Sequence, residues 1–296
     1  MNPSSKPTIG RAALFGNLAL ISLLWGSSFI LLKALSATFP PFTVAALRAG
    51  AATLAIVLMF LATGRRLLPT RDDLVAAAVM GTLHGFLPNA LVAYGVTGLG
   101  AGLAAMVQSA TPLVTALLAA FFLPGDRLSP RQMAGVLLGF AGVGLVIGPE
   151  AIGGPAAALW PALAMLATTV SYAIGNIWVR RAPPIPPERI ALGQQTGGFL
   201  GATVLSLVFE PWSGWTQAPA YWFEILIFGA VMSALPFTLF VRLIQRAGPV
   251  RATVVGYLVP IVATALAIAL LGETIALRQI AGAAVVIAGV VLVTRR

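Results

Sequence analysis

One stretch of this chain occurs twice, and this repetition constrains the fold more than any other feature. Residues Pro124 to Ile147 align without a gap with Leu271 to Thr294, with 10 identities in 24 positions. Arg131-Gln132 falls on Arg278-Gln279, a match that shared apolar bias alone would not produce. The offset is 147 residues, close to half of the 296-residue chain. Because internal repeats fix the architecture, we interpret the chain as a duplication.

Long apolar segments fill most of the chain. Hydrophobic residues make up 59% of it and charged residues only 9%, whereas soluble domains carry about 25% charged residues. A helix needs about 20 apolar residues to cross the hydrocarbon of a bilayer. Ten segments qualify: Leu14–Leu35, Phe42–Ala62, Leu74–Tyr94, Gly102–Leu123, Gln132–Ile147, Ala157–Val179, Ile190–Phe209, Tyr221–Leu243, Thr253–Leu271 and Gln279–Val293. The sequence therefore predicts an all-α integral membrane protein with ten transmembrane helices.

The arginines and lysines predict the orientation. With both termini in the cytoplasm, 15 of the 18 basic residues fall inside, and only Lys33, Arg48 and Arg278 do not. Five spans per repeat is an odd number, so the second repeat crosses the membrane upside down relative to the first. We expect two units, residues 1–148 and 149–296, as inverted five-helix repeats around a central cavity. Inverted repeats are typical of carriers that alternate between two open states.

Several function classes are disfavoured by what the sequence contains. The net charge of +10 is spread between apolar runs, without the basic patch that nucleic-acid binding requires. There is no cysteine and one histidine, which leaves little for an intramembrane enzyme or a metal site. No ATP-binding P-loop motif occurs. We therefore expect no cofactor and no enzymatic activity, although a scaffold or sensor in the membrane stays an alternative.

Ordered motifs give the chain a family resemblance. The first span carries Leu24-Trp25-Gly26-Ser27-Ser28-Phe29 with Lys33, and the second carries Leu47-Arg48. Pro112 and Pro260 are each followed by a Gly-acid turn and an Arg-Gln-x-Ala-Gly helix. This pattern resembles the EamA-domain proteins of the drug/metabolite transporter superfamily, which include amino-acid exporters of the YddG type. The resemblance implies a ten-helix basket with a central cavity that moves amino acids or related metabolites.

His84 is the only histidine and falls near the middle of the third span. Ionisable groups at membrane depth are costly and usually functional. Because imidazole titrates near neutrality, His84 is a candidate for binding a substrate carboxylate or for carrying a proton during transport. The structural alternative is a neutral histidine that hydrogen-bonds to a neighbouring helix.

Other polar and aromatic side chains at membrane depth are candidates to line the cavity. They are Trp25, Ser28, Asn89, Gln108, Tyr172, Asn176, Ser233 and Tyr257. Trp25 and Tyr172 are repeat counterparts. The alternative for each is ordinary contact between helices. We expect structural roles for Arg48, as a partner of a helix end or of the other repeat, and for Lys33, which would extend to the lipid headgroups.

Four prolines form two repeat-related pairs within spans: Pro112 with Pro260, and Pro88 with Pro236. Proline removes a backbone donor and frees a carbonyl one turn earlier, which favours a kink. We expect these prolines to act in gating, with a static kink as the alternative.

Together these features predict a multi-pass carrier of the inner membrane that exports small metabolites, with amino acids as the first choice. Export of drugs or lipophilic cations is the second choice, because a cation would favour an acidic residue in the cavity and no span carries one at depth. The expected partners are a small-molecule substrate and the lipid bilayer.

Overall fold

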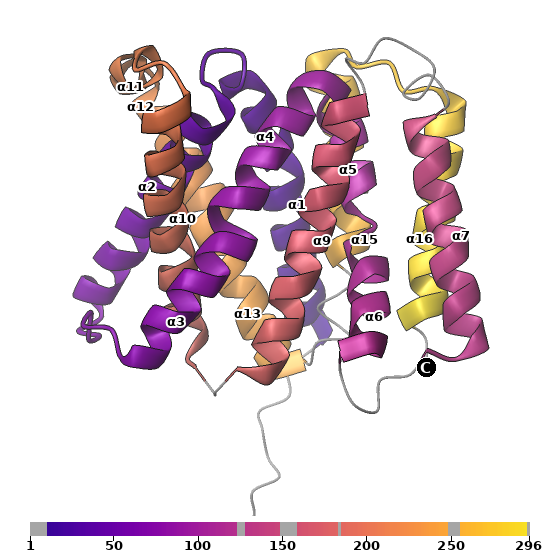
Figure 1. The fold of residues 1–296 in the computed structure, drawn as a ribbon, viewed down its shortest axis with the longest axis horizontal. Coiled ribbons are helices and arrows are strands. Elements are labelled where there is room, and N and C mark those ends of the chain that lie inside the picture. The colour runs from indigo at the N-terminus through magenta and orange to yellow at the C-terminus, as the bar shows by residue number, and fades with distance from the viewer. Residues whose placement is uncertain (1–10, 123–127, 149–158, 183–184, 248–254, 295–296) are drawn as a thin grey trace, which may run out of the picture.

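The chain folds into a bundle of helices (Figure 1). The computed structural model describes residues 11–122, 128–148, 159–182, 185–247 and 255–294, and within them no strand occurs. The first half contains α1 (Arg11–Leu35), α2 (Pro41–Ala62), α3 (Arg71–Met80), η1 (Gly81–Phe86), α4 (Leu87–Leu99), α5 (Ala101–Gln108), α6 (Thr111–Phe122) and α7 (Pro130–Ile147). The second half contains α9 (Leu159–Arg181), α10 (Pro187–Phe209), α11 (Ser213–Gln217), η2 (Ala218–Tyr221), α12 (Trp222–Leu226), η3 (Ile227–Ala234), α13 (Leu235–Ala247), α15 (Val255–Leu271) and α16 (Leu277–Thr294).

Seven helical stretches of the described residues are long and apolar enough to cross a membrane. Two shorter apolar helices, Leu258–Leu271 and Leu277–Val293, accompany them. Consecutive elements such as α3, η1 and α4 form one stretch, Arg71–Leu99. The prediction of an all-helical membrane protein is confirmed. The number of crossings, the inverted repeat and the orientation stay predictions.

Local sequence signals explain where the helices begin. Thr70 and Asp73 form a reciprocal capping box at the start of α3, and Ser129 and Gln132 form another at the start of α7. Such boxes satisfy amide groups that have no partner inside the helix. Proline occupies the first turn of α2, α7 and α10, where its missing N–H costs nothing.

The helices α7 and α16 stand side by side at one edge of the bundle (Figure 1). Their contact is made through glycines. A Cβ atom on Gly142 would lie 2.8 Å from the carbonyl oxygen of Gly282, and one on Gly282 would lie 2.8 Å from that of Gly142. Figure 1 also shows that α1 begins and α16 ends at the same end of the bundle.

Two π-helical segments interrupt the bundle, and each precedes a proline. The segment η1 leads into α4, where Pro88 is the second residue, and η3 leads into α13, where Pro236 is the second residue. Within η1, Gly85 has non-helical angles of φ −92° and ψ −108°. Segments of this kind occur often at functional sites.

The other proline pair differs between the halves. The helix is interrupted by a turn at Ser109 and Ala110, between α5 and α6, and Pro112 is the second residue of α6. In contrast, α15 continues through Pro260. The kink expected at Pro112 is therefore a break, whereas its repeat counterpart lies within an unbroken helix.

Ion pairs of two carboxylates link helix ends that are distant in the sequence. Near the start of α10, Glu188 pairs with Arg65 at 3.1 Å and with Arg242 at 3.8 Å. The neighbouring Arg189 pairs with Asp73 of α3 at 2.7 Å. These contacts join the turn after α2 to the start of α10 and the end of α13.

Two further carboxylates cap helix N-termini. Glu210 accepts hydrogen bonds from the backbone N–H groups of Phe42 and Thr43 at the start of α2, at 2.6 and 2.7 Å. Glu273 accepts them from Ala101 and Gly102 at the start of α5, at 2.7 and 3.0 Å. A carboxylate at a helix N-terminus is favoured by both the free N–H groups and the helix dipole.

Candidate functional site

Arg48 lies at the centre of a polar cluster inside the bundle. Its Nε donates to the Ser233 hydroxyl at 2.6 Å, and its NH1 nitrogen donates to the Asn89 side-chain oxygen at 2.9 Å. The guanidinium lies over the Phe228 ring, 4.8 Å from its centroid. Arg48 comes from α2, Asn89 from α4, and Ser233 and Phe228 from η3, so this cluster joins three separate elements.

Glycine lets η3 approach α2 at this point. A Cβ atom on Gly229 would lie 2.6 Å from the Arg48 carbonyl oxygen and 2.7 Å from the Ala52 nitrogen. The Ser233 hydroxyl also donates to the Phe228 carbonyl, five residues earlier, at 2.6 Å. Ser233 is 1% exposed and Asn89 5%, so both partners of Arg48 are fixed by their surroundings.

A second cluster surrounds His84 in η1. Its Nε2 lies 2.9 Å from the Tyr172 carbonyl oxygen, and the ring centroids of His84 and Tyr172 are 4.9 Å apart. The imidazole packs against Gly175, where any side chain would collide with it. The two clusters are joined along the chain, because Asn89 follows His84 by five residues across η1 and α4. Of the residues predicted from the sequence, the structure brings His84 to Tyr172 and, through Arg48, Asn89 to Ser233.

Side chains from α9 and α10 satisfy the carbonyl groups of η1. The Ser171 hydroxyl donates to the Leu83 carbonyl at 2.8 Å, and the Gln194 amide donates to the His84 carbonyl at 3.2 Å. The side-chain oxygen of Gln194 is buried and has no hydrogen-bond partner among the described residues. A buried polar atom without a partner is costly, so this oxygen is an acceptor left open on the side chain that bonds to η1.

The remaining predicted residues whose side chains are described lie outside these two clusters. Trp25 packs on Phe240, with ring centroids 5.2 Å apart, and Ser28 donates to the Trp25 carbonyl of its own helix. Asn176 donates to the Thr115 hydroxyl at 3.4 Å. Gln108 ends α5, and its buried side-chain oxygen has no partner among the described residues. Tyr257 lies on α15, but its side chain falls outside the part of the structure that is described.

Lys33 differs from its sequence-based expectation, whereas Arg48 agrees with it in part. The Lys33 Nζ donates to the carbonyls of Val96 and Thr97 at 3.0 and 3.2 Å, so it caps the C-terminal end of α4 rather than extending to the headgroups. Arg48 does link to the other repeat, as expected, through Ser233. Arg48 was not among the site residues predicted from the sequence, yet in the structure it connects two of them, Asn89 and Ser233.

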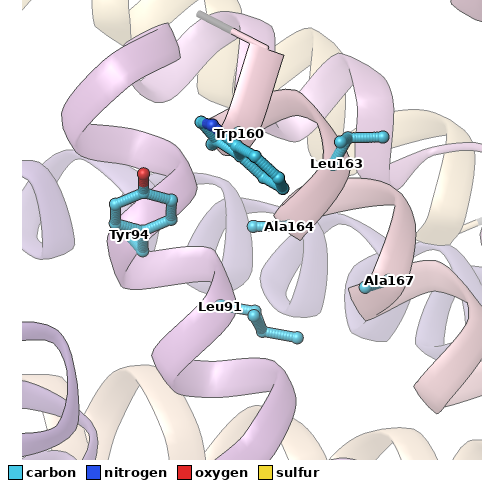
Figure 2. Close-up of a pocket in the computed structure, with 6 residues that line it drawn as sticks. All are labelled: Leu91, Tyr94, Trp160, Leu163, Ala164 and Ala167. Carbon is cyan, nitrogen blue, oxygen red and sulfur yellow. The ribbon is translucent and has the colours of Figure 1, made fainter. Parts of the chain in front are cut away.

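Two apolar grooves lie on the outside of the bundle and contain none of the predicted site residues. The larger, of about 360 Å³, runs between α4 and α9. Figure 2 shows the residues that line it, which are Leu91 and Tyr94 of α4 and Trp160, Leu163, Ala164 and Ala167 of α9. A smaller groove of about 210 Å³ shares Leu91 and Tyr94 with it. Tyr94 and Trp160 are exposed. Such aromatic residues are typical of the boundary between membrane and water.

Binding by hydrogen bonds and charge is the chemistry that this arrangement supports. Among the described residues, no group of three histidine, cysteine, aspartate or glutamate side chains could hold a metal ion. The clusters offer a guanidinium, an imidazole, a phenol and two amides, which suit a small polar solute.

Comparison with known proteins identifies relatives over nearly the whole chain. The inner membrane transporter YedA of Escherichia coli (strain K12) is 27% identical over 289 residues, which cover 95% of this chain and 90% of that protein. The aromatic amino acid exporter YddG of Ancylobacter novellus is 32% identical over 170 residues, covering 55% and 56% of the two chains. A solved crystal structure at 22% identity matches 96% of both chains with a TM-score of 0.67, which supports the fold alone.

The family match is made twice along the chain. The model of the EamA-like transporter family matches residues 13–148 and again residues 159–295. This match, with the apolar helices, confirms the predictions of a multi-pass inner membrane protein and of a transporter rather than an enzyme. The chain belongs to the EamA-like transporter family.

Proposed function

We propose that this transporter exports small metabolites, foremost amino acids, across the inner membrane by alternating access. The observation that carries the proposal is the reciprocal packing of α7 and α16. Gly142 meets Gly282, and Gly135 meets Gly289. With the offset of 147, Gly282 is the counterpart of Gly135 and Gly289 that of Gly142. Each contact is therefore the repeat-related counterpart of the other, which is the pattern that a two-fold rotation axis between the repeats requires.

Reciprocal contacts of this kind support two halves of opposite orientation. We propose that residues 1–148 and 149–296 each cross the membrane five times, with both termini in the cytoplasm. The paired π-segments also fit, because η1 shifted by 147 residues becomes 228–233, which falls within η3. Two similar halves can exchange inward-open and outward-open arrangements around one central site.

The polar clusters at η1 and η3 are the proposed solute site. They lie where the two π-segments meet helices of the opposite half: Arg48 of α2 meets Ser233 of η3, and Gln194 of α10 meets the His84 carbonyl of η1. We propose that His84, Tyr172, Asn89 and Ser233 contact the solute first. The chain's likeness to a protein named as an aromatic amino acid exporter favours a solute of that class.

The prolines are the proposed hinges of the exchange. Pro88 and Pro236 follow η1 and η3, where the regular helical hydrogen bonds are already interrupted, and Pro112 follows a break in its span. Pro260 lies in an unbroken helix and would bend without a prior break. In this mechanism, bending at these points opens one end of the bundle while the other closes.

Flux into proteoliposomes tests the function. We expect labelled L-phenylalanine to enter vesicles that contain the protein, with saturation and with competition by unlabelled amino acid. A panel of amino acids at two pH gradients would identify the solute class and the contribution of protons. Uptake equal to that of empty vesicles for every member of the panel would contradict amino-acid transport.

A further inference from the structure

We propose that Arg48 binds the carboxylate group of the transported solute. This inference rests on the proposed export function and adds the chemical group that the site recognises. A guanidinium presents five N–H donors in a planar fork that matches a carboxylate. Two of its three nitrogens have side-chain partners, at Ser233 and Asn89.

Arg48 lacks an acidic partner among the described residues. Asp73 pairs with Arg189, and Glu188 pairs with Arg65 and Arg242. Glu210 and Glu273 cap the N-termini of α2 and α5. Both partners of Arg48 are neutral, so its positive charge is not compensated locally. A charge at membrane depth without a counter-ion is costly, and such residues usually mark a substrate or ion pathway.

The surroundings of Arg48 hold the guanidinium in place without neutralising its charge. Phe228 covers one face of the guanidinium, and Ser233 and Asn89 hold its edge by hydrogen bonds. If Arg48 served only to link helices, a carboxylate in place of the Asn89 amide would accept its hydrogen bond and also neutralise its charge. The neutral partners instead keep the charge available for a negatively charged group that arrives and leaves.

The position of Arg48 suits a group that must be released on either side. It lies on α2 of the first half and is held by η3 of the second half, so movement of one half against the other changes its contacts. His84, five residues before Asn89, and Tyr172, whose ring packs on His84, supply the polar and apolar surface for the rest of the solute. The guanidinium would therefore bind the carboxylate in one arrangement of the halves and release it as its own contacts change.

Calorimetric binding to the purified full-length protein tests this inference. The ligands are L-phenylalanine and L-phenylalaninamide. In the second, a neutral amide replaces the carboxylate. We expect the wild-type protein to bind L-phenylalanine about tenfold or more tightly than the amide, the ratio that a charged hydrogen bond provides. In Arg48→Gln, binding of L-phenylalanine should weaken by a similar factor, while binding of the amide changes by less than about twofold.

Two further variants separate recognition from folding. Arg48→Lys keeps the charge but loses the fork, so it should fall between the wild type and Arg48→Gln. Arg66→Gln is the matched control, because it removes an exposed arginine side chain far from the cluster and should leave both affinities unchanged. Thermal unfolding of each variant monitors the fold.

The outcomes distinguish this inference from the function on which it rests. Equal affinity of the wild type for L-phenylalanine and its amide would overturn the role of Arg48. This outcome does not depend on whether Arg48→Gln folds, and it would leave the proposed export function intact. A preference for the acid that Arg48→Gln retains would overturn it as well. If the wild type bound neither ligand and transported no amino acid, both the proposed function and the inference would fail.

Discussion

Gly135 and Gly289 meet backbone to backbone where α7 crosses α16. A Cβ atom on Gly135 would lie 2.8 Å from the Gly289 carbonyl oxygen, and a Cβ atom on Gly289 would lie 2.5 Å from the Gly135 carbonyl oxygen. Glycine is the one residue that allows such an approach, and small residues are how membrane helices come close. The two halves of the chain therefore touch at a point where neither can accept a side chain.

Replacing Gly289 by alanine should destabilise the protein. The added methyl group would force α7 and α16 apart, and overpacking of this kind costs about 1–3 kcal/mol. Thermal unfolding in detergent would measure the loss. Gly144→Ala is the matched control, because no atom lies within 4 Å of a Cβ atom at that position. Equal stability of Gly289→Ala and Gly144→Ala would mean that the helix contact is not as close as described.

Asp73 should matter much more than its neighbour Asp72. Asp73 is buried, accepts hydrogen bonds from the Thr70 N–H and hydroxyl at 2.8 Å, and pairs with Arg189. Asp72 is exposed. We expect Asp73→Asn to lower the free energy of unfolding by about 1–3 kcal/mol, and Asp72→Asn to change it by less than about 0.5 kcal/mol. Similar losses for the two variants would contradict the capping role.

The contribution of Glu188 to stability should depend on pH. Burial alone raises the pKa of Glu188, but hydrogen bonds from its own backbone N–H and from Arg65 outweigh burial, together with the charges of Arg65 and Arg242. The pKa of the folded state is therefore below its ordinary value of 4.5. The stabilisation is complete above the pKa of the unfolded chain and is lost as the pH falls through the pKa of the folded state.

This reasoning predicts that Glu188→Gln melts at a lower temperature than the wild type at pH 7. The gap should close as the pH falls below 4.5, because the wild-type carboxylate then takes up its proton. The difference should stay under about 1 kcal/mol, since Arg65 is largely exposed. It should also shrink in 1 M salt, which screens the ion pair. A gap that persists unchanged at low pH would exclude the ion pair as its cause.

Displacing the His84 ring should impair transport as much as removing it. Alanine at Gly175 would collide with the imidazole and push it from its position against Tyr172. We therefore expect Gly175→Ala and His84→Ala to lower the rate of uptake by about tenfold, the loss of one well-placed polar contact. Gly144→Ala again serves as the control. Normal transport and affinity in both variants would leave His84 with a packing role alone.

The helices were predictable because their signals are local. Apolar runs of span length, the Ser129–Gln132 capping box and proline in first turns lie within a few adjacent residues. The lone histidine also directed attention to His84, and the structure gives it a partner. These features depend on composition and spacing, which the sequence contains in full.

The partners of Arg48 were not predictable because they depend on how distant helices pack. Ser233 lies 185 residues away and reaches Arg48 only because Gly229 lets η3 approach α2. The difference between Pro112 and Pro260 is similar. At the break, the Ser109 and Thr111 hydroxyls donate hydrogen bonds to the carbonyl groups of Met106 and Gln108. Aligned prolines alone do not reveal this.

The inverted arrangement of the halves can be measured directly with cysteine labelling. The chain contains no cysteine, so single cysteines can be placed without altering native ones. Ser129 and Ala276 are exposed, occupy the turn before α7 and before α16, and differ by the repeat offset of 147. We expect Ser129→Cys to react with a membrane-impermeant maleimide only from the cytoplasmic side and Ala276→Cys only from the periplasmic side. Labelling of both from the same side would contradict the inverted repeat and, with it, the proposed mechanism of transport.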